Sequence, residues 1–154
     1  MNYSSLSRFS VVACGLVLFG CGAAGPTVPD ASPPATSLST ASLTQALRDG
    51  GATVTATGVM PRGSFPFFDV AAQGFVVNGE IVHVFEYSTA ANAATDQAKV
   101  AESGTPVGNV QITWIEPPRF YRNDRIIVLY VGRSDDVARR LEMILGRPFA
   151  GART

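Results

Sequence analysis

The sequence predicts an α+β fold with one mainly antiparallel sheet of about five strands and helices packed on one face, a two-layer sandwich. Two observations predict it. Apolar segments flank Asn78-Gly79, a dipeptide that favours a two-residue type I′ hairpin turn because both positions need positive φ. An apolar strand, a Ser or Thr cap and a helix also occur twice in succession, at 81–102 and 126–145, so the strand-strand-helix unit is repeated.

Local signals place the elements in chain order. Ser42, Ser88 or Thr89, and Ser134 precede helical patterns, and Ser and Thr are favoured N-caps. Gly50 and Gly146 follow two of these helices, where glycine ends a helix without strain. The expected elements are helix 43–49, strand 52–57, hairpin strands 67–77 and 80–87, helix 90–102, strand 110–115, a long turn 116–124, strand 125–131 and helix 135–145.

The N-terminal segment has the layout of a secretory signal. A polar start carries Arg8, residues 9–19 are nearly all apolar, and Leu18-Phe19-Gly20-Cys21 follows. An apolar run this short predicts a cleaved signal rather than a membrane-spanning helix, which needs about 20 apolar residues. A similar sequence ending at Cys14 lies too close to Arg8 to leave an apolar core before it.

These residues resemble the signal of bacterial lipoprotein precursors. The resemblance implies that residues 1–20 are removed and that Cys21 becomes the lipidated N-terminus. Its thiol would carry a diacylglyceryl thioether, and its amine would carry a fatty acyl chain such as palmitate. It also implies a protein held at the cell membrane or outer membrane on the extracytoplasmic face. The alternative is an ordinary signal peptide with a chance cysteine.

Composition then divides the remaining chain. Residues 21–41 are rich in Pro, Ala, Ser and Thr, a composition that cannot offset its ordering entropy and is typical of a flexible tether. Residues 42–151 form the expected single α+β domain, and 152–154 form a tail.

Charge and cysteine usage exclude several function classes. Twelve basic and twelve acidic residues balance, which argues against nucleic-acid binding. With Cys14 removed and Cys21 lipidated, the domain has no thiol for catalysis. His83 is the single histidine, so a His-rich metal site is excluded, and we expect no metal or cofactor. His83 is either a structural histidine with its hydrogen bonds made within or at the edge of the sheet, or a catalytic residue of an envelope hydrolase together with acidic partners.

One stretch favours an interaction site. Arg119, Phe120, Tyr121 and Arg122 follow a Pro-Pro bend, and aromatic residues and arginine are enriched at binding hot spots. They form either an exposed patch for an envelope protein or an anionic polymer, or part of the core.

The domain resembles small lipoprotein and secreted domains of bacteria that have no established function. The resemblance rests on Val77-Asn78-Gly79-Glu80, Val84-Phe85-Glu86-Tyr87, Pro117-Pro118-Arg119-Phe120-Tyr121-Arg122 and residues 127–132. It implies a shared fold and no activity. The sequence thus predicts a lipid-anchored, non-enzymatic binding or accessory module, and its alternatives are the His83 hydrolase and a purely structural assembly domain.

Overall fold

The computed structural model describes residues 37–153 of the chain. The expected signal at 1–20, the lipidation site Cys21 and residues 22–36 of the expected tether lie outside the described residues. Within them, no helix is both long enough and apolar enough to cross a bilayer.

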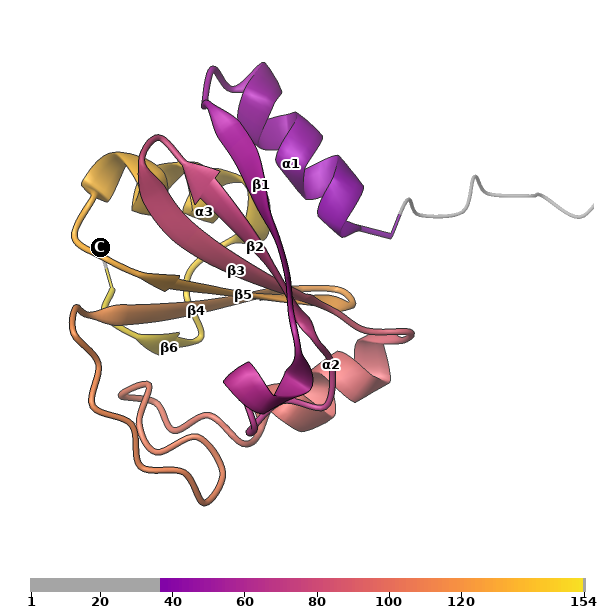
Figure 1. The fold of residues 1–154 in the computed structure, drawn as a ribbon, viewed down its shortest axis with the longest axis vertical. Coiled ribbons are helices and arrows are strands. Elements are labelled where there is room, and N and C mark those ends of the chain that lie inside the picture. The colour runs from indigo at the N-terminus through magenta and orange to yellow at the C-terminus, as the bar shows by residue number, and fades with distance from the viewer. Residues whose placement is uncertain (1–36, 154) are drawn as a thin grey trace, which may run out of the picture. The chain divides into compact units, whose positions relative to one another are not determined.

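A six-stranded sheet organises the described residues (Figure 1). Its strands lie in the order β1-β2-β3-β5-β4-β6, and every neighbouring pair is antiparallel. The strands are β1 (Val54–Met60), β2 (Ala72–Val77), β3 (Glu80–Glu86), β4 (Pro118–Asn123), β5 (Ile126–Val131) and β6 (Ala150–Gly151). The α+β class and the antiparallel sheet are confirmed, with six strands where about five were expected.

Helices cover both faces of the sheet, so the prediction that they pack on one face is wrong. The helices are α1 (Thr40–Asp49), α2 (Ala90–Gln97) and α3 (Asp135–Leu145), with a short 3₁₀ helix η1 (Arg62–Ser64). Apolar residues of α1 and α3 share one core cluster with Val82 and Val84 of β3. Ala93 of α2 belongs to a second cluster with Phe85, and successive strand residues point to opposite faces.

Strand β5 carries the sequence signal for this two-sided arrangement. Ile126 and Val128 belong to the α1–α3 cluster, whereas Ile127 and Leu129 belong to the α2 cluster. A strand buried on both faces has a continuous apolar run rather than alternation. The run from Ile126 to Val131 therefore indicates cover on both sides of the sheet.

The β2–β3 hairpin is confirmed in detail. Asn78 and Gly79 have φ of 49° and 90°, the positive values that a type I′ turn requires. The expected pairs of Val77 with Glu80, Val76 with Ile81 and Phe75 with Val82 are all present. The Asn78 side chain also accepts a 2.8 Å hydrogen bond from the backbone N–H of Thr53, which joins the turn to the start of β1.

The structure confirms helix α3 and moves the limits of the other two. Asp135–Leu145 follows an N-cap at Ser134 as expected. Helix α1 begins three residues early, because Ser39 is its N-cap and Ser42 completes the capping box from inside the helix. Helix α2 ends at Gln97 instead of residue 102, where the chain turns into the loop before β4.

Two expected elements between α2 and β5 exchange roles. Residues 110–115 form no strand beyond a single bridge of Val110 to Val107. The expected turn at 116–124 instead contains β4, which pairs with β5 along its whole length. A tight turn joins β4 to β5, and in it Asp124 has a φ of 50°. Pairing with β5 thus decides which apolar segment becomes the strand.

Hydrogen bonds between side chains and the backbone hold the irregular segment at 110–115 in place. The Thr105 hydroxyl donates to the carbonyl of Ile112 at 3.0 Å and accepts from its N–H at 3.3 Å. The indole N–H of Trp114 donates to the carbonyl of Gly104 at 3.0 Å. These bonds replace part of a strand ladder, so the segment lies against the α2 face as an ordered loop.

Candidate functional site

The interaction patch expected at Arg119, Phe120, Tyr121 and Arg122 is not an exposed loop tip. These residues lie in β4, where Phe120 and Tyr121 are fully buried on opposite faces of the sheet. Arg119 is 7% exposed, and Arg122 is half-buried with a 3.5 Å hydrogen bond to the carbonyl of Asp124. The structure therefore excludes three of the four from a surface patch, because a strand interior leaves them no access.

Arg119 has a structural role in the connection between β5 and α3. Its guanidinium donates a 2.7 Å hydrogen bond to the carbonyl of Gly132 and lies 5.7 Å from the centre of the Tyr130 ring. The Tyr130 hydroxyl accepts a 2.7 Å hydrogen bond from the N–H of Ser134, the N-cap of α3. Strand β4 thereby holds the segment that starts the last helix.

His83 lies on the α2 face of β3, as expected from its position between Ile81 and Phe85. Its ring centre is 4.8 Å from that of Phe65, and its buried Nδ1 has no hydrogen-bond partner. Burial lowers the pKa of His83, and no carboxylate contributes to the shift. Among the described residues, the acidic partners of the hydrolase alternative do not gather around this imidazole.

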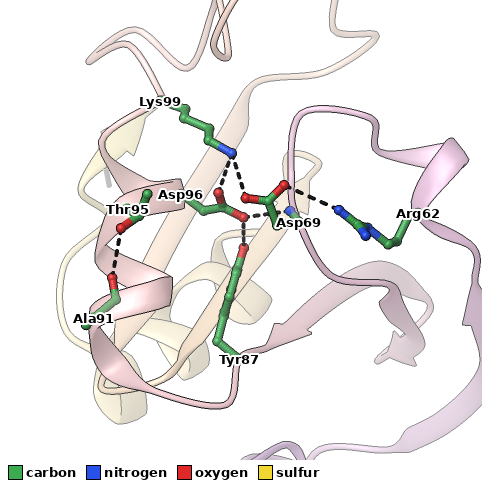
Figure 2. A network of polar contacts seen from close by, with 7 residues as sticks. All are labelled: Arg62, Asp69, Tyr87, Ala91, Thr95, Asp96 and Lys99. Atoms are coloured by element: carbon green, nitrogen blue, oxygen red, sulfur yellow. Dashed lines mark hydrogen bonds and ion pairs between the residues drawn. The ribbon is translucent and has the colours of Figure 1, made fainter.

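Among the described residues, Asp96 at the end of α2 is the most buried of the Asp, Glu, Lys and Arg side chains (Figure 2). Its side chain is 1% exposed. One carboxylate oxygen accepts hydrogen bonds of 2.7 Å from the Tyr87 hydroxyl and 2.7 Å from the N–H of Asp69. The other oxygen lies 2.5 Å from the Lys99 ammonium. Lys99 also contacts the Asp69 carboxylate at 3.1 Å, and Arg62 pairs with the same carboxylate.

The electrostatics of this Asp96 cluster favour fixed protonation states. Burial alone would raise the pKa of Asp96, but hydrogen bonds from Lys99, Asp69 and Tyr87 outweigh it and hold that pKa below its usual value. Burial and the Asp96 carboxylate raise the pKa of Tyr87, and hydrogen bonding to Asp96 raises the pKa of Lys99. At neutral pH Asp96 is therefore a carboxylate, Tyr87 a phenol and Lys99 an ammonium, and none of these three is close to titration.

Groups so far from titration are poor general acids or bases at neutral pH. The cluster instead ties α2 and β3 to the loop that carries Asp69. Sequence reasoning missed it, since its members are spread over residues 62–99. The one local signal is the i,i+3 spacing of Asp96 and Lys99 within the helix expected at 90–102, since residues three apart on a helix are neighbours.

A polar cavity of about 300 Å³ adjoins the cluster, lined by Asp69, Val70, Tyr87, Ser88, Asn92 and Thr95. Its polar groups already have protein partners. The Asn92 amide donates to the Ser88 hydroxyl at 3.0 Å, and the Thr95 hydroxyl donates to the carbonyl of Ala91 at 3.1 Å. The cavity is large enough for a small polar molecule and presents no orphaned group that selects one.

A second, shallow groove of about 390 Å³ lies at the β2–β3 hairpin end of the sheet. Ile81 and Ile115 line it and are 55% and 91% exposed. Arg133 and Glu116 also line it and form an ion pair with each other. Protein interfaces combine apolar side chains with polar and charged ones, and the groove presents both kinds. With the Arg119–Arg122 segment buried, this groove is the better candidate for an interaction surface.

Among the described residues, no three His, Cys, Asp or Glu side chains gather as metal ligands would. Comparison with protein-family models, with curated proteins and with solved structures finds no match to this chain.

Proposed function

We propose that the chain is the precursor of a lipid-anchored cell-envelope protein whose domain is a non-enzymatic binding or accessory module. Cys21, placed after Leu18-Phe19-Gly20 and the apolar run, is the observation that carries the proposal. Cysteine supplies the thiolate that lipid transfer needs. Several acyl chains hold a protein far more firmly than one, because each buried CH₂ contributes about 0.8 kcal/mol.

The partners follow from this location. The membrane is contacted through the lipid on Cys21, on the extracytoplasmic face of the cell membrane or outer membrane. The domain would meet an envelope protein or an anionic polymer, and the groove beside Ile81 and Ile115 is where apolar contact is available. A purely structural assembly domain would use the same surface. No observation at His83 favours the hydrolase alternative.

The chain provides a matched pair of variants for testing the anchor. Cys21→Ala should leave the chain unlipidated and uncleaved, because the modified thiol is gone. Cys14→Ala should leave processing unchanged, because the sequence before Cys14 has too short an apolar run. Intact-mass measurement of the membrane fraction of an expressing bacterium distinguishes precursor, cleaved and acylated forms.

A wild-type mass that corresponds to an unmodified Cys21 would overturn the proposed anchor. So would normal lipidation of Cys21→Ala together with its loss in Cys14→Ala, since the acyl chains would then be on the other cysteine.

A further inference from the structure

The two edges of the sheet differ in how far their backbone groups are paired. At the β4 edge, β6 pairs with Arg119 and Phe120. Flanking bonds extend the cover: the N–H of Phe149 donates to Phe120 and the N–H of Ala152 donates to Pro118, both at 2.8 Å. At the opposite edge, β1 pairs with β2 on its inner side, and no other described strand lies beside it (Figure 1).

The exposed strand β1 has few of the features that protect natural sheet edges. Edge strands are usually short, charged or interrupted by proline. Residues 52–60 contain no charge and no proline, β1 is seven residues long, and residues 55–59 are all exposed. Val59 is 70% exposed. One bulge lies between Ala56 and Gly58, and it is the one protective feature in this strand, because a bulge bends an edge strand and hinders further pairing.

The backbone register shows which groups remain open. The carbonyl of Thr53 accepts a hydrogen bond from the N–H of Asn78, so Thr53 faces β2. Alternation along a strand then turns the N–H and C=O of Val54 and Ala56 outward. The carbonyl of Val54 accepts from Arg48 at 3.3 Å, which agrees with this assignment. Ala56 has its backbone donor and acceptor on the open side.

We propose that β1 pairs antiparallel with β1 of a second copy of this chain, joining the two sheets across a two-fold axis. An exposed strand edge takes another strand, because its backbone groups need hydrogen-bond partners. An antiparallel pair of identical strands is self-complementary about a two-fold axis. The segment 52–60 carries no charge of its own, and the Arg48 guanidinium that reaches the open side lies at the Val54 end of β1.

Side chains favour a second copy over a foreign strand. Recognition of a different peptide by strand addition draws its specificity from pockets for alternate side chains. Neither cavity described above is lined by a β1 residue. Thr55 and Thr57 are instead exposed along β1, and opposed threonines and β-branched residues form favourable cross-strand pairs. The exposed side chains of β1 therefore favour pairing with an identical strand.

The test is the oligomeric state of the full chain, extracted in detergent under reducing conditions and followed by sedimentation equilibrium. We expect a concentration-dependent dimer. Val59→Lys places a charge at the edge of each copy and should weaken the dimer at least tenfold. Met143→Lys is the matched control: Met143 is 77% exposed but lies on α3, and this variant should dimerise like wild type.

Ala56→Pro is a second variant, because it removes an outward N–H that β1–β2 pairing does not use. It should also give monomers with an unchanged far-ultraviolet circular dichroism spectrum. A wild-type chain that stays monomeric at hundreds of micromolar would overturn the proposal. Equal dimerisation of all variants would do the same, as would a wild-type complex that contains a foreign strand in place of a second copy.

Dimerisation through β1 can be tested independently of the lipid anchor. Cys21→Ala should dimerise through β1 as the wild type does, whether or not Cys21 proves to be lipidated. Loss of the dimer in Cys21→Ala, with β1 intact, would show that the lipid and not the strand holds the copies together.

Discussion

The two faces of the sheet are covered in different ways. On one face, the amphipathic helices α1 and α3 pack aliphatic residues such as Leu43 and Leu141 against the strands. On the other, α2 contributes one fully buried alanine, Ala93, and irregular segments supply most of the cover. A helix with an alanine face buries little area, so other groups must complete that core.

Aromatic rings and the Asp96 cluster complete the α2 face. Phe68 lies with its ring centre 4.7 Å from that of Phe85 and 6.3 Å from that of Phe120, both in edge-to-face geometry. Such pairs add about 0.5–1.5 kcal/mol each beyond their buried area. Asp96 then fixes the loop that precedes β2. The comparison shows that loops can cover a sheet face when rings and a buried carboxylate replace helical packing.

The largest expected effect is on the helical face. Leu141→Ala should destabilise the domain by roughly 2–5 kcal/mol, because the side chain is fully buried and its loss leaves a cavity. Chemical denaturation measures the change in the free energy of unfolding. Met143→Ala, on the exposed side of the same helix, is the control and should have little effect. A Leu141 variant that unfolds like wild type would show that α3 does not cover the core.

On the opposite face, Asp96→Ala should cost about 2 kcal/mol. Breaking a fully buried ion pair costs roughly 3–5 kcal/mol. The Lys99 side chain is one-third exposed, so water can hydrate its unpaired ammonium and the cost is smaller. Tyr87→Phe removes one hydrogen bond and should cost less. Faster amide exchange around Asp69 would show that the loop has been released. An unchanged exchange rate would mean that the aromatic rings hold the loop without the carboxylate.

Arg119 and Arg122 provide a test within one strand. Arg119→Ala should lower stability by about 1–2 kcal/mol, because it removes a buried hydrogen bond and a contact with the Tyr130 ring. Arg122→Ala should change the melting temperature by less, because its hydrogen bond is long and exposed. If the order of the two effects were reversed, the structural role given to Arg119 would be wrong.

The smallest effect is the pH dependence from His83. Its pKa is lowered in the folded state by burial, so the unfolded chain takes up this proton first as the pH falls. The stability is fully present above the unfolded pKa of about 6.5 and declines below it. Melting temperatures between pH 7.5 and 5 should fall for wild type and less for His83→Gln.

Carboxyl groups with lowered pKa values affect stability in a different pH range. Asp96 and Glu86 have lowered pKa values, so their stabilisation is lost only at pH values below their ordinary pKa of about 4. Identical curves for wild type and His83→Gln above pH 5 would show that folding does not lower the pKa of His83.

Local chemistry determined several parts of this protein from its sequence. Asn78-Gly79 fixes the hairpin and its register because two adjacent positive φ values are difficult for most other residues. Ser134 and the two acidic residues after it start α3 at the expected position, since they satisfy and complement its first turn. The signal that ends at Cys21 is also a local pattern, and its lipidation stays a prediction.

Tertiary pairing decided the rest. Residues 110–115 and 118–123 both have apolar character, and only the second finds a partner strand, because β5 is within reach of a tight turn. The same pairing buries Phe120 and Tyr121 and turns an expected surface patch into core. The Asp96 cluster joins residues from four separate segments. Contacts of this kind depend on which elements meet in space, and a local window of sequence does not contain that information.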